Sequence, residues 1–94
     1  MKSAVYGIAK TILDGLKDAD AQIEYAKTAA GKPDVVNRHI EEAKRRLTGV
    51  KEWCDIMRKE MGDKPDPIAE VYLDLMLQWH RNAVERIVNA KPGA

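Results

Sequence analysis

Carboxylates and a histidine at helical spacing are the residues of this 94-residue chain best suited to chemistry. Glu24 precedes a second group, His39 and Glu42, and facing helices that project such side chains inward can hold a pair of metal ions. The order here is His-x-x-Glu, the reverse of the usual metal-binding pair, and Arg45 stands where a ligand histidine would. Helical-wheel arithmetic puts Glu24 and Glu42 roughly 120° from the apolar sides of their helices. This placement favours solvated carboxylates over metal ligands.

The same region resembles a known family. Residues 16–26 (LKDADAQIEYA), followed after a turn by residues 39–47 (HIEEAKRRL), look like the helical hairpin of small ferritin-like, rubrerythrin-type proteins. That family uses a glutamate in the first helix and Glu-x-x-His in the second to bind iron. The resemblance covers roughly residues 9–60 and implies Glu24 and Glu42 as ligands, with the histidine replaced by Arg45. An alternative function is therefore ferritin-like metal binding at a degenerate or inter-subunit site of Glu24, His39 and Glu42.

Other catalytic constellations are not recognisable in the sequence. Ser3 is the only serine, the glycines are isolated from one another, and Cys54 has no second cysteine. Cys54 falls on an apolar helix face, where a free cysteine behaves as a small buried hydrophobe. These features predict a non-enzymatic protein with no catalytic residues and no cofactor.

Charge and composition narrow the partners. Sixteen basic residues against fifteen acidic ones leave a net charge of +1, which offers no electrostatic attraction for nucleic acid or an anionic membrane. Lys10, Asp14 and Lys17 interrupt the N-terminal segment, and no run approaches the ~20 apolar residues of a membrane span. We therefore expect a cytoplasmic protein that binds neither nucleic acid nor membrane.

Two breaks divide the chain into three helical segments. Gly31, Pro33 and Asp34 mark the first break, and Gly62 through Pro67 the second; each combines a helix-ending glycine with a proline and a capping aspartate. We expect helices at roughly 4–30, 34–61 and 67–90 within a single domain, 1–94. Ser3, Asp34 and Asp66 are the expected N-caps. Short connections make sequential helices antiparallel, so the predicted fold is an all-α, up-down-up three-helix bundle.

Apolar residues recur at alternating steps of three and four, the pattern of helices packed with a left-handed twist. In the first two helices the seams are Val5, Ile8, Ile12, Leu16, Ala19, Ile23, Ala26 and Ala30, and Val36, Ile40, Ala43, Leu47, Val50, Cys54, Met57 and Met61. Gly49 could mark a close crossing. The alanines of the seams (Ala19, Ala26, Ala43, with Ala83) leave open a third function, binding of a small apolar ligand.

The third helix carries more apolar surface than one core needs. One stripe contains Ile68, Tyr72, Leu75, Met76, Trp79, Ala83, Ile87 and Ala90, and the second adds Ala69, Leu73, Leu77, His80, Val84 and Val88. Together they span about half of the circumference, more than the ~100° stripe of a helix on a single core. The sequence therefore predicts an assembly module that forms a homo-oligomer, or binds a helical protein, through Leu73, Leu77, His80, Val84 and Val88.

Overall fold

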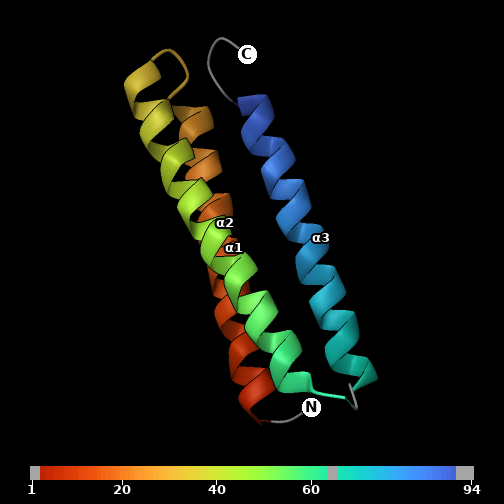
Figure 1. Ribbon diagram of the computed structural model, residues 1–94. Coiled ribbons are helices and arrows are strands. Elements are labelled where there is room, and N and C mark those ends of the chain that lie inside the picture. The colour runs from red at the N-terminus through yellow and green to blue at the C-terminus, as the bar shows by residue number, and fades with distance from the viewer. Residues whose placement is uncertain (1–2, 64–65, 91–94) are drawn as a thin grey trace.

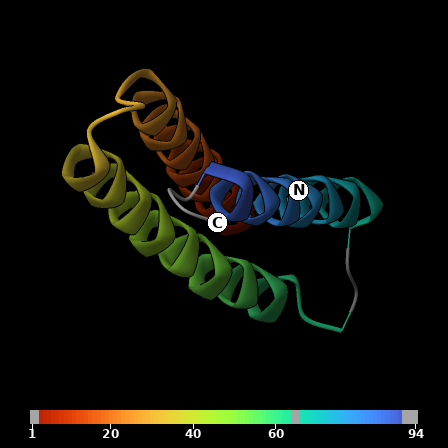
Figure 2. The same cartoon turned by 90° about the horizontal axis from the view of Figure 1, so that it is seen from above.

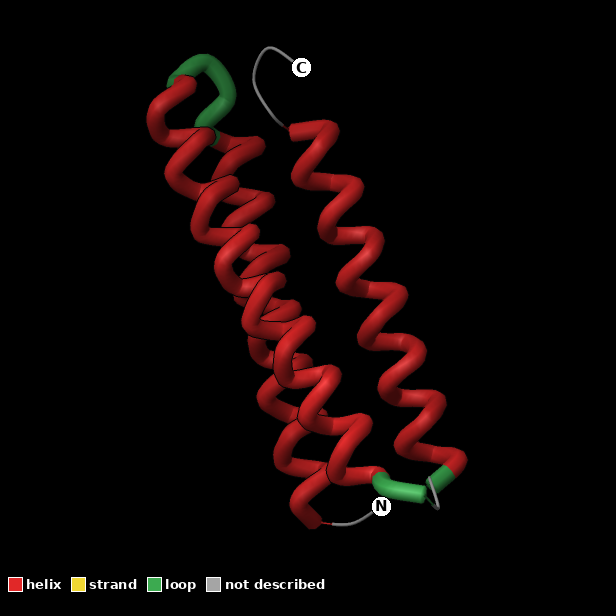
Figure 3. The backbone as a smooth tube through the Cα atoms, in the orientation of Figure 1, coloured by secondary structure: helices red, strands yellow, loops and turns green. Residues whose placement is uncertain are grey.

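The computed structural model describes residues 3–63 and 66–90, which form three helices. They are α1 (Ser3–Thr28), α2 (Pro33–Met61) and α3 (Pro67–Ala90), joined by short loops (Figures 1 and 3). No strand occurs in this part of the chain, so the predicted all-α, three-helix class is confirmed. Within the same residues, no helix is long and apolar enough to cross a bilayer.

The helices lie side by side in a rod of about 50 × 18 × 16 Å. In Figure 1, α1 runs upward, α2 returns beside it, and α3 runs upward again along the pair. The view from above shows α3 beside both other helices (Figure 2). As a result, α1 and α3 point in the same direction and share one face of the rod.

The two loops between the helices each contain a glycine with positive φ, but the helices that follow them start in different ways. Gly31 and Gly62 have φ of +98° and +68°, a region that side chains rarely adopt, so each ends a helical turn. Asp66 caps α3 as expected, because its Oδ1 accepts a 2.8 Å hydrogen bond from the Ile68 amide. The expected cap at Asp34 is wrong: Pro33 opens α2 and Lys32 is the N-cap residue, without a side-chain cap. The N–H of the first helical residue has no partner within the helix, so proline, which lacks an N–H, is well suited to that position. The helix therefore starts at Pro33, one residue before the predicted start.

The cores of α1 and α2 follow the predicted seams closely. All eight seam residues of α2 are buried, from Val36 to Met61. In α1 the buried residues are Val5, Ile12, Leu16, Ala19, Ile23 and Ala26. Ile8 packs against them while partly exposed. One α1 expectation fails, because Ala30 lies exposed beyond the helix end, while Ser3 is the first described residue of the helix.

The core face of α3 differs from the prediction. Its buried residues are Ala69, Leu73, Met76, Ala83 and Ile87, a line between the two predicted stripes. Ile68, Tyr72 and Leu75, which belong to the first of these stripes, are exposed. Two side-chain hydrogen bonds hold this rotation: the Trp79 indole N–H donates to Asp20 Oδ2 at 2.8 Å, and His80 Nε2 donates to the Leu47 carbonyl at 3.1 Å. His80 thus lies along the core line.

The close approach of α1 and α2 occurs at Gly15, not at Gly49. A Cβ added at Gly15 would lie 2.8 Å from Cγ2 of Val50, whereas one at Gly49 would meet nothing within 4 Å. Val50 is buried and its side chain is stiff at χ1, so it cannot move aside easily.

Alanine at these two glycines is expected to act with opposite signs. Both substitutions remove a flexible residue from a helix interior, a gain of up to ~1 kcal/mol. Gly15→Ala also overpacks the α1–α2 contact, so it is expected to be about 1–3 kcal/mol less stable than Gly49→Ala. Urea unfolding of both variants measures this difference, and equal stabilities would contradict the close approach.

Candidate interaction surface

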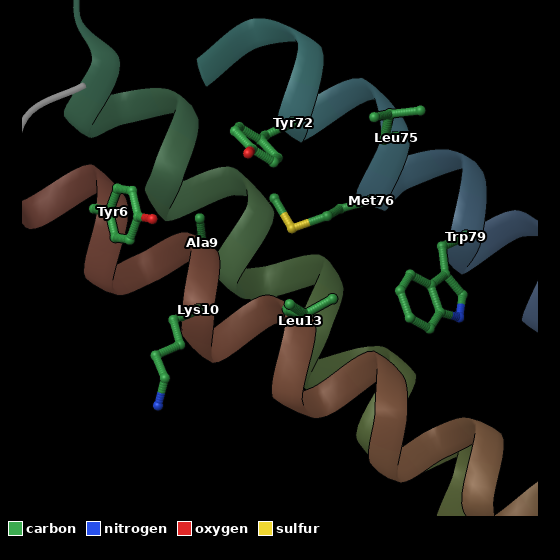
Figure 4. A pocket seen from close by; sticks show the side chains of 8 residues that line it. All are labelled: Tyr6, Ala9, Lys10, Leu13, Tyr72, Leu75, Met76 and Trp79. Carbon is green, nitrogen blue, oxygen red and sulfur yellow. The ribbon is translucent and has the colours of Figure 1, made fainter. Parts of the chain in front are cut away.

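An apolar groove runs between the first halves of α1 and α3 (Figure 4). It encloses about 530 Å³ and is lined by Tyr6, Ala9, Lys10, Leu13, Tyr72, Leu75, Met76 and Trp79. Figure 4 shows Tyr6 and Tyr72 on opposite walls, with Met76 between the helices and the Lys10 amine directed away. Lys10 is the one charged residue of the lining and forms a long ion pair, 3.9 Å, with Asp14. The groove can therefore accept apolar side chains.

Large apolar side chains are exposed in this groove and beside it. Three side chains of the lining, Tyr6, Tyr72 and Leu75, are about half exposed or more, and so are Ile68 and Val71 within one turn of them on α3. We call these five residues, together with the groove, the α1–α3 face. Apolar surface exposed around a groove marks binding sites in many soluble proteins.

Beyond Trp79 the same side of the molecule becomes polar. Asp20 accepts hydrogen bonds from the Trp79 indole at 2.8 Å and from Arg86 Nη1 at 3.1 Å, through separate carboxylate oxygens. Arg86 also pairs with Glu24 through Nη2, and Glu24 is paired with Lys27 at 3.5 Å. This network ties the second halves of α1 and α3 together and holds Trp79 as the end wall of the groove.

The candidate metal ligands are not brought together within one chain. Glu24 pairs with Arg86, while Glu42 pairs with Arg45 at 2.9 Å and with Arg46 at 3.1 Å. His39 Nδ1 donates to Gln22 Oε1 at 2.7 Å. In residues 3–63 and 66–90, no three His, Cys, Asp or Glu residues are close enough together to hold a metal ion.

The predicted interface residues of α3 divide into two sets. Leu73 is 4% exposed and belongs to the core of the chain itself. Leu77 is partly buried against that core, and the side chain of His80 bonds to the Leu47 carbonyl. Val84 and Val88 are exposed and line a second groove, of about 680 Å³, between α2 and α3. Ile68, Tyr72 and Leu75 of the other predicted stripe are exposed as well, together with Val71.

Cys54 lies in the core, 2% exposed, and carries a free thiol. Burial raises the pKa of the Cys54 thiol, and the positive charge of Lys51 only partly opposes that effect. The thiolate is the reactive form of cysteine, so this residue is poorly reactive at neutral pH.

Comparison with known proteins gives no match to a family model, to a curated protein or to a solved structure. The surface of the molecule itself is therefore the basis for a functional proposal.

Proposed function

We propose that this chain is a non-enzymatic helical assembly module that self-associates through the α1–α3 face. The observation that carries the proposal is an apolar groove with three exposed large apolar side chains in its lining, Tyr6, Tyr72 and Leu75, and with Ile68 and Val71 exposed within one turn of them on α3. Water contact with that much apolar surface is unfavourable, and covering it releases free energy in proportion to the area removed.

The exposed area supports a second copy of the chain as the occupant. Aromatic side chains bury about 150–250 Å² when fully covered, and we take the lower end of this range for Ile, Val and Leu. The five residues of the α1–α3 face are 49–64% exposed, which leaves roughly 100 Å² on each and about 500 Å² per copy. Two such faces together reach about 1,000 Å², the lower bound for a specific interface.

The charge balance also supports pairing of identical chains. The net charge of +1 leaves two copies with little mutual repulsion, and near-neutral proteins associate more readily than highly charged ones. We therefore expect a reversible dimer of moderate affinity.

Glutamate at Leu75 tests the proposal, with Val88 as the matched control. Leu75 and Val88 are 61% and 60% exposed and lie on different sides of α3. A charge at Leu75 would be desolvated in the dimer, so Leu75→Glu is expected to weaken association by about 100-fold or more, while Val88→Glu leaves it unchanged. Light scattering on a size-exclusion column gives the mass of each variant, and circular dichroism checks that helicity is retained.

Three results would contradict the proposal. The first is a wild-type chain that remains monomeric up to about 1 mM. The second is equal dissociation of both variants. The third is iron or zinc in stoichiometric amount in the same chromatographic peak, which would favour the metal-binding alternative at Glu24, His39 and Glu42.

A further inference from the structure

We draw no further inference here: the strongest candidate, the groove of about 680 Å³ between α2 and α3 that Val84 and Val88 line, carries nothing because nothing in the structure shows what covers it.

Discussion

Leu16→Ala is expected to lower the free energy of unfolding by about 3–5 kcal/mol. The Leu16 side chain is fully buried and is among the largest such side chains in the core. Its truncation removes apolar contacts and leaves a cavity that the helices cannot close fully. Chemical denaturation followed by circular dichroism measures the change in the free energy of unfolding.

The same substitution at Leu75 is the control. Leu75 is 61% exposed, so Leu75→Ala is expected to change the stability of the monomer by no more than about 0.5 kcal/mol. The measurement is made at low protein concentration, where dimer formation does not contribute to stability. A large loss for Leu75→Ala under these conditions would show that this residue belongs to the intramolecular core.

Asp20→Ala is expected to cost about 1–3 kcal/mol of folding free energy. The Asp20 side chain is 29% exposed. Its carboxylate accepts hydrogen bonds from both Trp79 and Arg86. Removing it leaves the Trp79 indole N–H without its acceptor and Arg86 with Glu24 as its one remaining carboxylate partner among the described residues. Asp14→Ala is the matched control: Asp14 is exposed and pairs with Lys10 at 3.9 Å, an interaction worth less than ~0.5 kcal/mol.

A double-mutant cycle identifies the source of the Asp20 effect. Trp79→Phe removes the indole N–H that donates to Asp20 and keeps an aromatic ring. The losses from Asp20→Ala and Trp79→Phe are expected to be less than additive, because both delete the same hydrogen bond. Full additivity would mean that the bond does not contribute to stability.

The helices and the α1–α2 packing could be predicted from sequence. Each of the first two helices has a single apolar seam, so only one rotation buries it, and all eight α2 seam residues are buried as expected. The turns were also predictable. Gly31 and Gly62 can adopt the positive φ that ends a helix, and the Asp66 side chain can cap the start of the next one.

The rotation of α3 could not be predicted in the same way. Its apolar residues cover about half of the helix, so several rotations bury a similar area and hydrophobicity does not choose among them. The choice depends on hydrogen bonds between residues distant in sequence, Asp20 with Trp79 and Leu47 with His80. The exposure of Ile68, Tyr72 and Leu75 and the burial of Leu73 both depend on that rotation.

The short connections between the helices affect how fast the chain folds. Residues 29–32 join α1 to α2, and 62–66 join α2 to α3. Contacts within single helices outnumber those between helices, and helical bundles of this kind fold in microseconds to milliseconds. Association of two chains depends on protein concentration, whereas folding of one chain does not. A slow refolding phase that accelerates with protein concentration would therefore report the meeting of two α1–α3 faces.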